Sequence, residues 1–112
     1  VSMAALRDLK IKTSSCNRII KDLRSYEKEV EKEAAKSEDM KEKGADPYDI
    51  KQQESVVAES RMMIPDCRKR LENSLRDLKG ILVELEGENS GAEEIKEAKT
   101  TVGEAERVFE SA

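Results

Sequence analysis

The side chains of this chain that are capable of chemistry are its carboxylates and two cysteines, Cys16 and Cys67. The chain has no histidine, so it lacks the commonest general base and metal ligand of proteins. The cysteines have neither C-x-x-C nor metal-site spacing, and no glycine-rich phosphate loop occurs. Carboxylates are an ordinary feature of exposed helices. We therefore predict no catalytic residues, no metal site, no cofactor and no enzymatic activity.

The composition also limits the partners of the protein. Of its 112 residues, 41% are charged and 3% are aromatic, and the net charge of −4 comes from interleaved signs. Such a chain lacks the basic field that holds nucleic acid by counterion release. No apolar run reaches the ~20 residues of a membrane span, and no signal-peptide core occurs. We expect a cytoplasmic protein that binds neither nucleic acid nor membranes.

The elements that carry these side chains are predicted to be long helices. Richness in Ala, Glu, Lys, Leu and Arg is typical of long helices or coiled coil. Apolar and small residues recur every three or four positions over residues 4–43, 47–86 and 91–110. The short connections between these segments favour antiparallel neighbours. We predict an all-α fold, an antiparallel up-down-up three-helix bundle that is coiled-coil-like and forms one domain over residues 1–112.

Helix boundary signals support these three segments. Gly44 suits a left-handed C-cap after the first helix. Asp46 suits the N-cap of the second helix, with Pro47 in its first position. Ser90 and Glu93 have the spacing of a capping box for the third helix. Cys16 and Cys67 fall on core positions, so we predict buried free thiols rather than a disulfide.

Pro65 lies in the middle of the second predicted helix. An interior proline removes one backbone hydrogen bond, crowds the carbonyl of Arg61 four residues earlier, and costs ~3 kcal/mol or more. We predict that this helix bends near Pro65. The residues alone leave open whether the bend serves function or is only tolerated.

One stripe of the second helix is predicted to face away from the core. Taking Ile64 as the inward direction and ~100° of rotation per residue, this stripe is polar except for Tyr48 and Met62. Methionine adapts to irregular apolar surfaces, which suits contact with a partner. The predicted partner-binding residues are Tyr48, Lys51, Glu59, Met62, Asp66, Lys69 and Arg70. A second candidate surface, for an acidic protein, comprises Arg7, Lys10, Lys12, Arg18, Lys21 and Arg24 of the first helix with Arg61, Arg68, Lys69 and Arg70.

Three segments resemble one known family. They are Ile11-Lys12-Thr13 leading to Tyr26-Glu27-Lys28-Glu29, the run Tyr48-Asp49-Ile50-Lys51-Gln52-Gln53-Glu54, and the run Glu59-Ser60-Arg61-Met62-Met63-Ile64-Pro65-Asp66-Cys67. The last run, inside a long helix, is the most specific of the three. The family is tubulin-binding cofactor A, also called tubulin-folding cofactor A. The resemblance fades after about Leu85, and residues 44–48 with Glu29-Val30 are similar to plant members.

The resemblance implies a cytoplasmic, cytoskeleton-associated chaperone. Such a protein captures β-tubulin folding intermediates stoichiometrically, without nucleotide, for later assembly of the αβ-tubulin heterodimer. The resemblance leaves open whether the protein contacts other tubulin-folding cofactors, and it identifies no established contact residues. Composition alone is also compatible with an alternative function, that of a structural coiled-coil adaptor module that binds a partner helix. We expect a monomer rather than a dimer.

Overall fold

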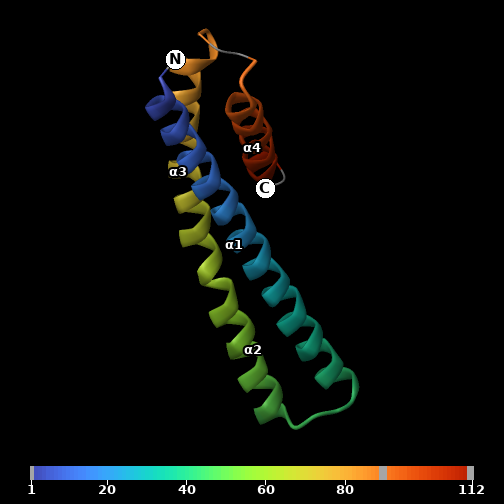
Figure 1. Cartoon of the computed structure of the whole chain (residues 1–112). Coiled ribbons are helices and arrows are strands. Elements are labelled where there is room, and N and C mark those ends of the chain that lie inside the picture. Colours follow the sequence, from blue (N-terminus) through green and yellow to red (C-terminus); the bar gives the residue numbers. More distant parts are fainter. Residues whose placement is uncertain (1, 89–90, 111–112) are drawn as a thin grey trace. The chain divides into compact units, whose positions relative to one another are not determined.

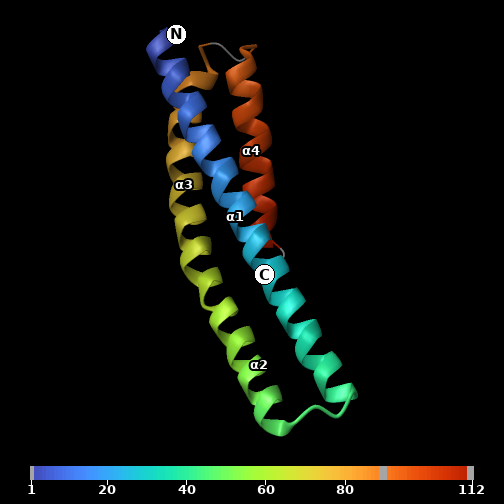
Figure 2. The ribbon, with the colours of Figure 1, turned by 60° about the horizontal axis from the view of Figure 1, so that its bottom comes forward.

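The structure, a computed structural model, describes residues 2–88 and 91–110, and most of these residues are helical. Its helices are α1 (Met3–Glu42), α2 (Pro47–Arg61), α3 (Met63–Glu86) and α4 (Glu93–Glu110) (Figures 1 and 2). No strand occurs in these residues, so the predicted all-α class is confirmed. The complete up-down-up arrangement stays a prediction.

The backbone divides into two compact units, which are described separately below. Unit 1 consists of Val1–Ile20 and Lys69–Ala112, and unit 2 consists of Lys21–Arg68. The N-terminal half of α1 therefore belongs to unit 1 and its C-terminal half to unit 2. None of the described helices combines the length and the apolar character that crossing a membrane requires.

The connection between α1 and α2 forms as its residues predict. Gly44 has a φ of 69°, the left-handed conformation that glycine adopts without steric cost. Its N–H donates to the Lys41 carbonyl at 3.2 Å, and the Ala45 N–H donates to the Met40 carbonyl at 3.0 Å, which together make a Schellman motif. Asp46 then caps α2, because its side chain accepts a hydrogen bond from the N–H of the second helical residue at 2.8 Å.

The second predicted helix, residues 47–86, consists of two helices in the structure. α2 ends at Arg61, Met62 lies between the helices with φ −62° and ψ −22°, and α3 begins at Met63. The bend predicted near Pro65 therefore corresponds to this interruption. Pro65 has no N–H to offer the Arg61 carbonyl, and a new helix start places the proline in a first turn, where that N–H is not needed.

The last helix begins two residues later than predicted. α4 starts at Glu93 rather than at residue 91, and the carbonyl of Ala92 accepts hydrogen bonds from Ile95 at 3.1 Å and Lys96 at 3.2 Å. Ala92 thus takes the position before the first helical residue. Ser90, the predicted N-cap, lies outside the described residues.

Unit 1 has an aliphatic core. In both views α4 runs beside α3 and the N-terminal part of α1 (Figures 1 and 2). The hydroxyl of Thr101 on α4 bonds the Asn17 side chain of α1 at 3.1 Å, and Lys79 of α3 pairs with Glu106 of α4 at 3.0 Å. The buried hydrophobic side chains of this unit are Leu9, Cys16, Ile20, Leu71, Leu75, Leu78, Leu82, Leu85, Ile95, Ala98 and Ala105. All of them lie within the segments 4–43, 47–86 and 91–110, where apolar and small residues recur every three or four positions.

Unit 2 consists of the C-terminal half of α1, α2 and the first residues of α3, and its interior is more polar. Its buried hydrophobic residues are Leu23, Val57 and Cys67, and the polar residues Ser37 and Gln53 are buried beside them. The Gln53 amide nitrogen donates to the main-chain carbonyl of Glu33 at 3.0 Å and to its carboxylate at 2.7 Å. Two helices alone enclose little apolar volume, so this bonded amide contributes part of the contact between α1 and α2.

Candidate partner-binding surface

The predicted partner-binding residues are all exposed. Tyr48, Lys51 and Glu59 lie on α2, Met62 lies at the interruption and Asp66 lies in the first turn of α3, all within unit 2. Lys69 and Arg70 follow on the next turn of α3 and belong to unit 1. The structure therefore places these residues at the surface, and their role in binding stays a prediction.

Several large apolar side chains are accessible in this largely polar region. Met62 is 74% exposed and Tyr48 is 67% exposed, and neighbouring Met63 is 49% exposed. Met62, between α2 and α3, lies on the side that helical rotation predicted to face outward, and Met63 is the first residue of α3. From residue 48 to residue 66 the surface extends for ~27 Å along the helices, at ~1.5 Å per residue. An elongated partner contact is the geometry that this favours.

Several charges on this surface have no internal counterpart. Lys51, Glu59 and Asp66 form no ion pair with any residue of the described ranges, whereas Lys69 pairs with Glu72 at 3.7 Å. Unpaired charges of both signs remain available to a partner of mixed charge. An ion pair between exposed residues contributes only ~0–1 kcal/mol. Pairs formed between this surface and a partner would therefore orient the partner more than they strengthen its binding.

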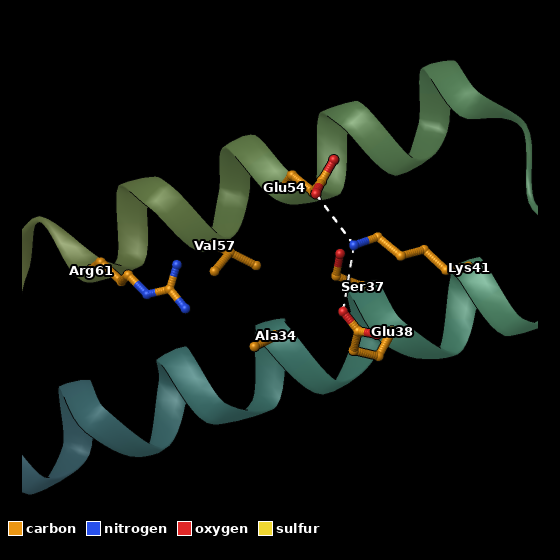
Figure 3. A pocket seen from close by; sticks show the side chains of 7 residues that line it. All are labelled: Ala34, Ser37, Glu38, Lys41, Glu54, Val57 and Arg61. Atoms are coloured by element: carbon orange, nitrogen blue, oxygen red, sulfur yellow. Dashed lines mark hydrogen bonds and ion pairs between the residues drawn. The ribbon is translucent and has the colours of Figure 1, made fainter.

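A small groove lies between the helices of unit 2 (Figure 3). It has a volume of about 170 Å³, and its lining residues are Ala34, Ser37, Glu38, Lys41, Glu54, Val57 and Arg61. The Lys41 ammonium lies between two carboxylates, 3.4 Å from Glu38 and 3.4 Å from Glu54. Glu38, and then Glu54, raise the pKa of Lys41 above its ordinary value. This lysine therefore stays protonated and is unsuited to act as a nucleophile.

The cysteines are equally unsuited to nucleophilic chemistry. Cys16 and Cys67 are buried free thiols, as predicted. Burial raises the pKa of Cys16, the charge of Glu104 raises it further, and a hydrogen bond with Ser74 opposes the rise. The thiol is thus held in its protonated, unreactive form. The described residues contain no group of three or more potential metal-ligating side chains.

Helical spacing did not identify the groove or the contact between Gln53 and Glu33. A signal for the contact between Gln53 and Glu33 was available, since Gln53, like Ser60, is a polar residue that interrupts the apolar recurrence over residues 47–86. Spacing also took Ile64 as the inward reference, but Ile64 is only partly buried. The nearby core residues Val57 and Cys67 are 6% and 1% exposed, so the inward direction lies closer to these two.

Known proteins share both the sequence and the fold of this chain. The family model for tubulin binding cofactor A matches residues 4–102. The tubulin-folding cofactor A of Arabidopsis thaliana is 65% identical over 109 residues, which cover 96% of each chain. Its crystal structure superposes with a TM-score of 0.90, at 64% identity, over 95% of this chain and 99% of that chain.

More distant members of the same family also match this chain in sequence and structure. The human tubulin-specific chaperone A is 46% identical over 94 residues, covering 84% of this chain and 86% of the human protein. The structure of Rbl2p, a β-tubulin binding post-chaperonin cofactor, has a TM-score of 0.78 at 25% identity, over 92% of this chain and 98% of that chain. The Arabidopsis protein is more similar to this chain than the human one, which fits the predicted likeness to plant members. On this match of sequence and structure, the chain belongs to the tubulin binding cofactor A family.

Proposed function

We propose that this protein is a cytoplasmic, cytoskeleton-associated chaperone that captures β-tubulin folding intermediates in one-to-one complexes and holds them for assembly with α-tubulin. The observation that carries the proposal is the family match over residues 4–102, together with relatives named for tubulin folding and β-tubulin binding. Capture uses binding energy alone and requires neither nucleotide nor catalysis. Contact with other tubulin-folding cofactors is part of the same proposal.

The surface that we assign to capture contains Tyr48, Lys51, Glu59, Met62, Asp66, Lys69 and Arg70. The exposed Met62 and Tyr48 supply apolar contact, and the unpaired charges around them supply orientation. A few accessible apolar side chains in a polar surface bury little apolar area, so the complex is expected to be reversible. Reversibility is what a holding chaperone needs, because its client must leave for assembly.

Capture by purified tubulin subunits tests the function. The immobilised protein is incubated with β-tubulin or α-tubulin released from the same denatured heterodimer, with and without ATP. We expect retention of β-tubulin in about equimolar amount, little α-tubulin and no effect of ATP. Equal retention of both subunits, or retention of neither, contradicts the proposal.

The alternative, a coiled-coil adaptor, requires an apolar seam that is open to another helix. In unit 1 the seam residues of α3 are covered: Leu71 and Leu78 are 0% exposed and Leu82 is 7% exposed. This burial favours a monomer with internally satisfied helices. Sedimentation over a hundredfold range of protein concentration distinguishes the monomer from the adaptor, because a protein with an open seam would associate as its concentration rises.

A further inference from the structure

We propose that the outward face of α1 in unit 2 is a docking site for an acidic protein segment, separate from the surface assigned to β-tubulin. We call it the basic face and define it by Lys21, Arg24, Lys28 and Lys32. Together with Ser25 and Glu29, these residues line an open groove of about 430 Å³. The occupant that this face fits is a stretch of chain rich in Asp and Glu.

The spacing of the basic face follows one side of the helix. Lys21, Lys28 and Lys32 recur at intervals of seven and four residues, which places them in one row over ~16 Å of helix. All three are exposed. Because each residue turns the helix by ~100°, Asp22 and Glu27 fall about 90° or more around the helix from the middle of this row, whereas the exposed Glu29 and Glu31 fall about 80° to either side of it. Of these carboxylates, Glu29 lines the groove.

The lysines of the basic face are not neutralised within the molecule. Lys21, Lys28 and Lys32 form no ion pair with any residue in the part of the chain that the structure describes. Directly after Lys32, the Glu33 carboxylate accepts a hydrogen bond from Gln53 and so is directed toward α2. The row of ammonium groups is therefore available to carboxylates of another molecule.

Charge and composition favour an acidic protein over other anionic partners. The whole chain has a net charge of −4, so a long polyanion such as nucleic acid is repelled by most of the molecule. None of the six lining residues is aromatic, so bases have nothing to stack on. None is a large apolar residue, which insertion into a membrane surface requires. A short acidic segment matches the row in charge and length without these disadvantages.

The test uses the full-length protein and a fluorescein-labelled peptide of ten glutamates, followed by fluorescence anisotropy at low and physiological salt. The variant Lys28→Gln/Lys32→Gln is compared with Lys96→Gln/Arg107→Gln, which removes the same charge from an exposed lysine and an exposed arginine of α4 that form no ion pair with any described residue. Glutamine has nearly the helix propensity of lysine, so both variants keep their helices. A labelled oligothymidylate of ten nucleotides is the second probe.

We expect the peptide to bind, to bind more weakly as salt rises, and to lose at least fivefold in affinity in Lys28→Gln/Lys32→Gln but less than twofold in the control variant. Equal losses in the two variants overturn the proposal, because only net charge then matters. Absence of peptide binding also overturns it, as does oligothymidylate binding that shows the same selective loss. The assay contains no tubulin, so a negative result does not contradict the proposed function. Loss of β-tubulin capture, in turn, does not contradict the assignment of the basic face.

Discussion

The side-chain amide nitrogen of Gln53 on α2 contacts Glu33 on α1 twice, at 3.0 Å from its main-chain carbonyl and at 2.7 Å from its carboxylate. Gln53 is 7% exposed, so these bonds form largely away from water. They tie together two helices whose shared interior contains few large apolar side chains. A hydrogen bond to a charged group contributes ~1.5–3 kcal/mol, more than an exposed ion pair.

Replacing Gln53 tests the contribution of this contact to stability. Gln53→Met keeps the length of the side chain but cannot donate, so we expect the free energy of unfolding to fall by about 1–3 kcal/mol. Urea unfolding followed by circular dichroism measures the change. Gln52→Met, at the exposed neighbouring position, is the matched control and should stay within about 0.5 kcal/mol of the parent protein. Similar stability of the two variants would show that the contact is energetically unimportant.

The surface assigned to β-tubulin is tested by a double substitution. Met62→Asp/Arg70→Glu removes an exposed apolar contact and reverses an exposed charge, and we expect β-tubulin capture to weaken at least tenfold, about 1.4 kcal/mol. Helicity and melting should change little, because both residues are exposed. Val83→Asp/Lys96→Glu is the control, since Val83 is 76% exposed and Lys96 is exposed on α4. An equal loss in the control, or a loss of helicity in the test variant, argues against the assignment.

The interruption around Met62 predicts how the protein responds to loss of its proline. Pro65 lies in the first turn of α3, where a missing N–H costs little, so Pro65→Ala should change the free energy of unfolding by less than about 1 kcal/mol. A gain of about 3 kcal/mol in chemical denaturation would instead reveal a strained interior proline. β-Tubulin capture by the same variant addresses the role of the bend. We expect weaker capture, because a straightened helix repositions Met62; unchanged capture means that the bend is only tolerated.

Burial separates two apolar residues that spacing places on the same stripe. Leu71 is 0% exposed, so Leu71→Ala should destabilise the protein by about 2–5 kcal/mol. Ile64 is only partly buried, and Ile64→Ala should cost clearly less, about 1 kcal/mol. Thermal melting of the two variants decides the order. Equal losses would place Ile64 in the core after all.

The raised pKa of Cys16 predicts that its thiol reacts slowly with thiol reagents. Burial keeps the proton on the folded thiol, so we expect Cys16 in a Cys67→Ala variant to resist Ellman's reagent under native conditions and to react fully in urea. Because the folded pKa is raised, the stability that this group contributes is present below the ordinary thiol pKa and is lost as pH rises through the folded value. Rapid native labelling near neutral pH would contradict the burial of Cys16.

Sequence alone determined the helical class, the stripes and the ends of the first connection. Leu9, Cys16 and Leu71 recur at helical spacing and are buried, and Gly44 and Asp46 take the roles that their types predict. These features are local: rotation per residue, cap chemistry and the conformational freedom of glycine act within a few positions of one segment. The position of Pro65 likewise located the interruption of the second helix.

The tertiary structure decided which residues meet between helices. No spacing rule pairs Gln53 with Glu33, twenty residues earlier, because that contact depends on the register of α2 against α1. The same register directs the Glu33 carboxylate toward α2 and sets Ile64 at the edge of the buried stripe. Rotation along a single helix tells which side chains share a face. Only the packing of one helix on another determines which of them are covered, which are paired, and which remain free to bind a partner.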